Sequence, residues 1–232
     1  MLHLLQLKNV PIFEQLKIEE ALLRADDRNW CIINSGSPTS IVMGISGKYE
    51  EHVCPYMIDK LPIPVIRRFS GGGTVIVDEQ TFFFTLIGNK DLLDVPCYPD
   101  ELLKWTEKLY APAFEGLNFS LRDNDYVIGN KKFGGNAQYI CKNRWLHHSS
   151  LLWDYEKSKM DYLLMPKKVP AYRMGRDHTE FLCRLNTYFN DSCDLQDKIL
   201  KALRARFTLT AVDLKAIDST LSKTYRCSTQ LI

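Results

Sequence analysis

The chain has 232 residues, of which 45% are hydrophobic and 25% charged, a composition typical of a globular protein with a substantial core. Its 30 basic and 28 acidic residues give a net charge of +2, which excludes the broad basic surface of a general nucleic-acid binder. The length and the absence of repeats or low-complexity linkers predict one domain over residues 1–232.

Cysteine spacing and hydropathy exclude several further classes. The seven cysteines are scattered and never form a CxxC pair, which argues against a zinc site and against a disulfide framework. The N-terminal segment lacks the basic start and uninterrupted apolar core of a signal peptide. No segment reaches the roughly 20 apolar residues that span a bilayer. We therefore expect a protein with reduced thiols and no membrane contact that is cytoplasmic, or organellar if a targeting presequence has been removed.

The first part of the chain predicts one helix followed by several strands. Pro11 and the helical spacing of apolar residues predict a helix over residues 11–24. The segments that follow are short, rich in β-branched or aromatic residues, and bounded by Gly, Pro, Ser or Asn. They predict strands at residues 30–34, 41–45, 64–68, 74–78 and 81–87.

The second part alternates between helical and strand patterns. An acidic start and i, i+3, i+4 apolar spacing predict a helix over 99–114. Residues 125–140 are typical of a hairpin that turns at Gly129 and Asn130, with a further strand over 144–154. Helical patterns return after residue 155, with a helix near 192–206 and then a polar tail. The order predicts an α+β fold of mixed or antiparallel sheets flanked by helices.

The segment RRFSGGGTV, at residues 67–75, places two arginines, a serine and three glycines between two predicted strands. It matches neither the P-loop pattern GxxxxGK[ST] nor the dinucleotide pattern GxGxxG, and a strand rather than a helix follows it. Backbone N–H groups flanked by guanidinium groups suit a carboxylate or a phosphate. A glycine-rich bulge with two surface arginines is the alternative.

A second segment, GNKKFGGNAQ at residues 129–138, again combines basic residues with glycines. Two such loops in one chain favour a single anionic ligand held between them. Lysine is a compact point charge, so Lys131 or Lys132 is a candidate for stabilising negative charge that develops on one oxygen. Taken alone, the lysine pair also fits a solvated hairpin.

These two segments, followed by HHSSLLWD at residues 147–154, resemble the ordered signatures of the lipoate-protein ligase A family, within the biotin and lipoate ligase fold. The resemblance implies an enzyme that joins lipoate and ATP into lipoyl-AMP, with Mg²⁺ shielding the phosphates. A lysine of a lipoyl-accepting domain then takes the lipoyl group. The acceptors implied are the E2 protein of a 2-oxoacid dehydrogenase or the H protein of glycine cleavage.

The resemblance also assigns roles to individual residues. Lys132 is the expected catalytic residue, in contact with the reacting carbonyl and phosphate oxygens. Asp125 is expected to assist the nucleotide or its Mg²⁺, which otherwise binds through the phosphates. The residues expected to bind the acid and the adenylate are Arg68, Ser70, Gly71, Gly72, Gly73, Thr81, Asp125, Gly135, Asn136, Ala137 and His148. His147 and His148 are neighbours on a predicted strand, so only one of them should face the cleft.

Some positions differ from the usual pattern of the family. Thr81 stands where asparagine is usual, Gly134 where serine is common, and Tyr139 where arginine is common. Two alternatives therefore stay open: a transferase that takes octanoyl or lipoyl groups from a carrier protein or preformed lipoyl-AMP, and a non-catalytic homologue that binds lipoyl groups or a small acid. Cys141 is the only cysteine shortly after the lysine segment that could serve such a transferase as a nucleophile, but a thiol at that point fits strand packing better.

Two further expectations concern a possible lid over the site and a possible accessory domain. The segment MPKKVPAYR, at residues 165–173, is either a lid from which Lys167 or Lys168 reaches the ligand or a plain connector. No C-terminal accessory domain is expected within 232 residues. A separate accessory subunit would then be needed, or the catalytic domain acts alone.

Overall fold

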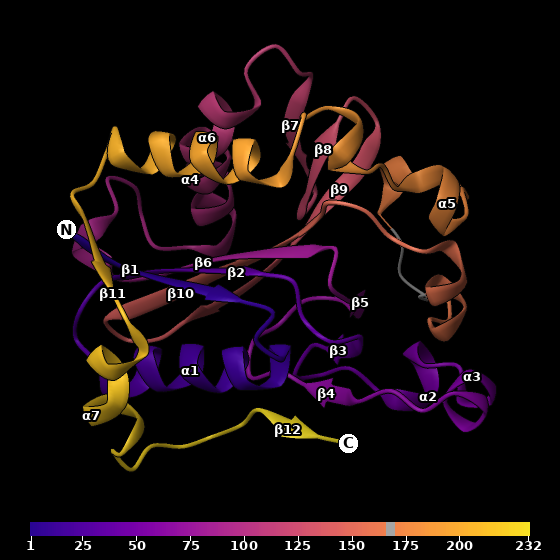
Figure 1. Ribbon diagram of the computed structural model, residues 1–232, viewed down its shortest axis with the longest axis horizontal. Coiled ribbons are helices and arrows are strands. Elements are labelled where there is room, and N and C mark those ends of the chain that lie inside the picture. The colour runs from indigo at the N-terminus through magenta and orange to yellow at the C-terminus, as the bar shows by residue number, and fades with distance from the viewer. Residues whose placement is uncertain (166–169) are drawn as a thin grey trace.

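The computed structural model describes residues 1–165 and 170–232 (Figure 1). Lys167 and Lys168, expected in a lid, lie outside the described residues. The strands of the described residues form two sheets, with the orders β11-β1-β2-β6-β10-β9-β8-β7 and β12-β4-β3-β5. The larger sheet contains β1 (Leu2–Lys8), β2 (Trp30–Ser35), β6 (Thr81–Asn89), β7 (Phe119–Arg122), β8 (Asp125–Ile128), β9 (Lys131–Ile140), β10 (Arg144–Leu152) and β11 (Leu209–Val212). The smaller sheet contains β3 (Ser40–Met43), β4 (Val65–Arg67), β5 (Val75–Val77) and β12 (Gln230–Leu231).

Both sheets are mixed, which confirms the expected α+β class. Strand β1 pairs in parallel with β2 and β11, and β3 pairs in parallel with β4, while the remaining pairs are antiparallel. The helices are α1 (Ile12–Ala25), α2 (Tyr49–His52), α3 (Pro55–Lys60), α4 (Pro99–Tyr110), α5 (His178–Phe181), α6 (Ser192–Arg204) and α7 (Asp218–Leu221). No helix of the described part is long and apolar enough to cross a membrane.

Helices cover both faces of the larger sheet, with α1 on one face and α4 and α6 on the other (Figure 1). Phe83 of β6 packs in a cluster with Ile12 and Leu16 of α1. Its neighbours Phe82 and Phe84 point to the opposite face and join the cluster that contains side chains of α4 and α6. Because β6 is buried on both faces, its sequence is a continuous apolar run rather than an alternating one.

The predicted elements between residues 11 and 204 occur with boundaries shifted by a few residues, and the two ends of the chain differ most from expectation. Residues 2–8 form a strand that local sequence patterns do not predict, and the expected polar tail is folded. The tail contains β11, α7 and β12, and it places Ile217 and Thr220 in buried positions. Two of its polar side chains, Thr220 and Thr229, are buried because they meet Asp26 just beyond α1 and Glu20 inside α1, which composition alone does not reveal.

Candidate active site

A cavity of about 1210 Å³ lies between α1, the smaller sheet and strands β6 and β8 to β10. Most of the residues predicted for the site line it, namely Arg68, Gly72, Gly73, Thr81, Asp125, Lys132, Gly135, Asn136, Ala137 and His148. Ser70 and Gly71 do not line it. Ser70 is 1% exposed and its carbonyl accepts a hydrogen bond from the N–H of Ile45, so it supports the glycine loop from behind.

One part of the cavity wall is apolar. It is formed by side chains of α1, the smaller sheet, β6 and β10, namely Ile12, Leu16, Val42, Val75, Val77, Phe83 and Leu152. The two α1 residues are four positions apart and therefore lie on one helix face. Such a wall suits a flexible hydrocarbon chain.

Lys132 reaches the cavity because of an irregularity in β9. The pairing of β8 with β9 shifts between Tyr126 and Val127, so that Val127 lies opposite Lys132 and Tyr126 opposite Gly134. Phe133 is thus left without a partner in the ladder, as in a β-bulge. Lys132 and Gly135 would face opposite sides of a regular strand, whereas the bulge directs both toward the cavity.

Asp125 connects Lys132 to the segment on the other side of the cavity. Its Oδ1 lies 2.7 Å from the Lys132 Nζ, and its Oδ2 accepts a hydrogen bond of 2.8 Å from the Tyr172 hydroxyl. Burial, followed by the negative charge of Asp125, raises the pKa of Tyr172 and keeps it a hydrogen-bond donor. The Lys132 side chain remains 21% exposed, so an anion entering the cavity can compete with Asp125 for its charge.

The glycine loop is built around the Arg68 side chain. Its Nη2 donates hydrogen bonds of 2.9 Å to the carbonyls of Gly71 and Gly73. Gly72 has a φ of +109°, and a Cβ at this position would lie 2.6 Å from the Arg68 Nη2. Arg68 is 5% exposed, and burial lowers its pKa to about 10, so it is still a cation at neutral pH. Its guanidinium therefore shapes the loop rather than standing free in the cavity.

Unpaired donors mark the cavity as suited to an anion. Among the described residues, the buried polar atoms without a partner include three from cavity-lining residues: Arg68 Nε, Thr74 Oγ1 and Arg173 Nη2. His178 also lines the cavity, and burial together with the Arg173 cation lowers its pKa, so it is neutral near pH 7. Arg173 ends the candidate lid segment at 165–173 but is not itself predicted for the site, and His178 is missed because it lies far from the glycine segments and matches no local pattern.

The two adjacent histidines face opposite sides of β10, as predicted. His148 lines the cavity, and its Nδ1 lies 3.0 Å from both the Glu19 carboxylate and the Thr85 hydroxyl. His147 is fully buried on the other side, where burial lowers its pKa to about 3. Glu19, 0% exposed on α1, was not singled out for the site, although it stands on the same face as Ile12 and Leu16.

Local packing accounts for two of the departures from the family pattern. A Cβ at Gly134 would lie 2.8 Å from the Leu151 Cδ2 and 3.2 Å from the Tyr126 Cβ, so glycine fits this tightly packed position. Thr81 is 1% exposed, and its hydroxyl accepts a hydrogen bond from the Asp78 N–H, which closes the turn between β5 and β6.

Thiols and clustered metal ligands are not part of the cavity wall. All seven cysteines are described, and none of them lines the cavity. The Cys141 thiol lies 3.3 Å from the Arg144 carbonyl within its own hairpin. In the part of the chain that the structure describes, no three His, Cys, Asp or Glu side chains are grouped to hold a metal ion.

Solved structures with the same fold include two lipoate ligases. One comes from a bipartite lipoate protein ligase and its E2 lipoyl domain from Thermoplasma acidophilum; it superposes with a TM-score of 0.77 at 18% identity, over 95% of this chain and 90% of the other. The second is a lipoate-protein ligase A bound with ATP, with a TM-score of 0.75 at 19% identity, over 95% of this chain and 92% of the other.

Curated relatives are similar over most of this chain. The inactive lipoate-protein ligase 2 of Plasmodium falciparum is 26% identical over 250 residues, and lipoate-protein ligase 1 of Staphylococcus aureus is 27% identical over 178 residues. The matches cover 82% and 75% of this chain but only 65% and 53% of the relatives. A sequence model of the lipoyl protein ligase A/B catalytic domain matches residues 11–207. The chain therefore belongs to the lipoyl protein ligase A/B catalytic domain family.

Proposed function

We propose that the protein uses ATP to attach lipoate to a lysine of a lipoyl-accepting domain, with lipoyl-AMP as the intermediate. The observation that carries this proposal is the position of Lys132 in a single cavity that joins an apolar wall to a glycine loop. The apolar wall suits the lipoyl chain, and the glycine loop and the unpaired donors suit the carboxyl group and the phosphates. Family membership and the ATP-bound structural neighbour support the same reaction.

The reaction has two steps. A lipoate carboxylate oxygen attacks the α-phosphorus of ATP, and the bond to pyrophosphate breaks. The acceptor lysine amine then attacks the carbonyl of lipoyl-AMP, AMP leaves with the bonding electrons, and the amine loses a proton. Both steps move negative charge onto oxygens near the acyl phosphate, where a fixed cation lowers the barrier. Lys132 supplies that cation when the ligand replaces Asp125 as its partner.

Mg²⁺ enters this proposal with ATP. It is bound mainly by oxygens and usually keeps several waters, so phosphate oxygens can supply most of its ligands. Both carboxylate oxygens of Asp125 have partners, Lys132 and Tyr172. Asp125 is freer to contribute to a metal once Lys132 turns toward the phosphates, because a neighbouring cation disfavours Mg²⁺ at the same carboxylate.

We infer that the acceptor is a lipoyl-accepting domain, such as that of a 2-oxoacid dehydrogenase E2 protein or a glycine-cleavage H protein. The Thermoplasma ligase described together with its E2 lipoyl domain supports this class of partner. The same ligase is described as bipartite, which supports a separate accessory subunit for this chain as well.

The main alternative is a protein that has lost activation and transfers a preformed acyl group. The relative named as inactive motivates this alternative. A thioester mechanism is disfavoured, because it requires a thiol at the acyl group and no cysteine lines the cavity.

Mass spectrometry of an apo lipoyl domain tests the proposal. The domain is incubated with the purified protein, lipoate and Mg²⁺, with and without ATP, and separately with synthetic lipoyl-AMP. We expect a lipoyl mass increment that requires ATP and is bypassed by lipoyl-AMP. If the acceptor is modified only from lipoyl-AMP, the purified protein performs the transfer step but not the activation step, or it needs an accessory subunit for activation. No modification from either donor would contradict the proposed function.

A further inference from the structure

The last 20 residues, 213–232, form a segment that we call the C-terminal strap. It passes from α7 beneath α1 to the edge of the smaller sheet (Figure 1). There β12 pairs antiparallel with β4, with Gln230 opposite Arg67 and Leu231 opposite Ile66, and the Ile232 N–H donates to the Val65 carbonyl at 2.9 Å. The family match ends at residue 207, so it assigns no role to the strap.

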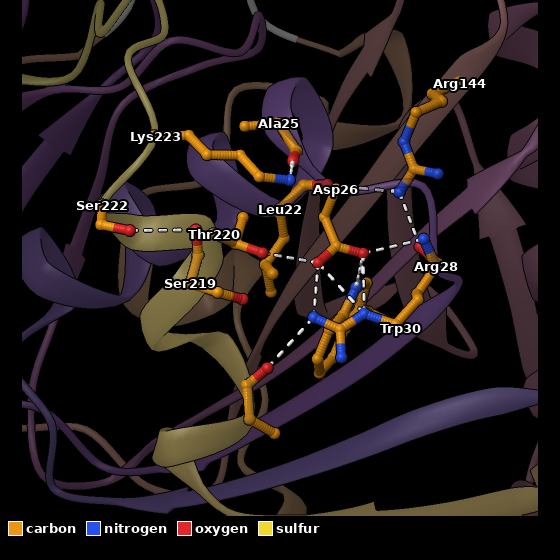
Figure 2. Close-up of polar contacts among 11 residues, drawn as sticks. Leu22, Ala25, Asp26, Arg28, Trp30, Arg144, Ser219, Thr220, Ser222 and Lys223 are labelled. Carbon is orange, nitrogen blue, oxygen red and sulfur yellow. Dashed lines mark hydrogen bonds and ion pairs between the residues drawn. The ribbon is translucent and has the colours of Figure 1, made fainter.

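The strap is fastened first at Asp26, just beyond α1. Figure 2 shows the Asp26 carboxylate accepting hydrogen bonds from Arg28, Trp30 and the Thr220 hydroxyl, the last at 2.7 Å. Although burial alone raises the pKa of Asp26, these hydrogen bonds outweigh it and lower the pKa well below the usual value. Lys223 adds a 2.7 Å hydrogen bond to the carbonyl of Ala25.

A second anchor lies at Glu20, inside α1. This residue is 0% exposed, and its carboxylate accepts hydrogen bonds from the N–H groups of Ser228 and Thr229 and from the Thr229 hydroxyl, at 2.9–3.0 Å. Its other partners are Arg24, at 3.0 Å, and the Cys227 thiol of the strap, at 3.7 Å. Without the strap, this buried carboxylate would lose most of its donors, and leaving such a group unsatisfied is costly.

The strap joins α1, which forms one wall of the cavity, to β4, the strand that leads into the glycine loop of another wall. On its inner face α1 contributes Ile12 and Leu16 to the apolar wall. Strand β4 leads directly into Arg68, which holds the glycine loop through its carbonyls. The strap therefore links the outer side of one wall to the edge strand that carries the other.

We propose that the C-terminal strap is a positioning element that holds the glycine loop against α1 and thereby sets the affinity of the cavity for its acid and nucleotide. The strap touches no cavity surface and acts through β4 and Arg68. Opening of β4 leaves the glycine loop free to move, so a fraction of the molecules cannot bind ligand. The identity of the ligands, lipoate and ATP, rests on the function proposed above.

The double substitution Thr220→Val and Thr229→Val removes one hydroxyl donor at each anchor with little change in side-chain shape. In the full chain we expect the KM for lipoate to rise about tenfold while kcat stays within about twofold, as when a binding-competent state is less populated. Hydrogen exchange of the amides of residues 65–75 should become faster, because local opening sets that rate. Thr220→Ser with Thr229→Ser keeps both hydroxyls and should restore both properties.

Thr224→Val is the matched control, since Thr224 is an exposed residue of the same strap. It should leave the KM and the exchange rates at wild-type values. A KM within twofold of wild type in the double valine variant, or an equal rise in the control, would overturn the proposal. If the wild-type chain shows no transfer, the function proposed above fails by itself, and exchange at residues 65–75 still decides whether the strap holds β4.

Discussion

The glycine loop after β4 and the glycine segment of β9 each combine a basic side chain with consecutive glycines, yet the structure uses the two cations differently. Arg68 is 5% exposed and donates to the carbonyls of its own loop. Lys132 has a side chain that is 21% exposed and forms an ion pair with Asp125 of the neighbouring strand β8. Arg68 supports the backbone of its loop, whereas Lys132 is available to a ligand. The two segments have similar compositions, and the difference in role comes from burial and from the hydrogen-bond partners of each cation.

The chemistry of the two side chains fits this division. A guanidinium group is planar and presents several donors at fixed angles, so it can satisfy two carbonyls of one loop at once. An ammonium group is a compact charge on a flexible stem and can exchange one partner for another. The following changes test the division, beginning with the largest expected effect.

Lys132→Ala should lower the rate of lipoyl transfer by about 10²–10³-fold, because the cation that offsets developing oxygen charge is removed. The thermal midpoint should fall by only a few degrees, because Asp125, which is 8% exposed, loses its cation partner but keeps the hydrogen bond from the Tyr172 hydroxyl. Mass spectrometry of the acceptor gives the rate, and circular dichroism gives the midpoint. Lys131→Ala, at the exposed neighbouring position, is the control and should retain transfer within about twofold. Wild-type transfer by Lys132→Ala would remove the role assigned to this lysine.

Arg68→Met should lower the free energy of unfolding by about 1–3 kcal/mol, because the carbonyls of Gly71 and Gly73 lose their donor. Activity should fall with stability, in contrast to Lys132→Ala. Urea unfolding measures the change, with Arg67→Met as the control for losing a less buried arginine. Full stability combined with lost activity would show that Arg68 acts on the ligand and not on the loop.

Gly72→Ala should lower the free energy of unfolding by about 1–2 kcal/mol, because the position has a φ of +109° and an added Cβ would meet the Arg68 guanidinium. Gly71→Ala is the matched control, because a Cβ there has nothing within 4 Å. Thermal unfolding of the two variants provides the comparison. Equal stability of both would show that the glycine loop tolerates side chains and that Arg68 does not constrain it.

The smallest expected effect is the contribution of His147 to the pH dependence of the free energy of unfolding. Unlike Arg68 and Lys132, His147 is a buried group that is neutral near pH 7. Its pKa is about 3 when folded and 6.5 ordinarily, so between these values the unfolded state binds more protons. Stability should therefore fall as the pH drops below 6.5, by about 1 kcal/mol between pH 7.5 and 5.5. Urea unfolding of wild type and His147→Gln at both pH values measures this. An identical pH dependence in the two proteins would mean that the pKa of His147 is the same in the folded and unfolded states.

Local patterns carried much of the prediction. The helix at α1, the apolar strand β6 and the turn at Gly129 follow from spacing and from backbone preferences that depend on neighbouring residues alone. The three ordered signatures identify the family without knowledge of any tertiary contact, because a motif is a property of the sequence. Most of the residues predicted for the site line one cavity, and their roles toward a ligand stay predictions.

The amino-acid sequence indicated most elements between residues 11 and 204, the family and most of the polar residues near the site. How those residues are used follows from the tertiary structure. The bulge at Phe133 turns Lys132 toward Asp125. The carbonyls around Arg68 make this arginine a support for the loop. The hydrogen bonds to Glu20 hold the polar tail against α1 as a strap. These outcomes depend on partners distant in sequence and on burial, and the free energy of a charged group is set by both.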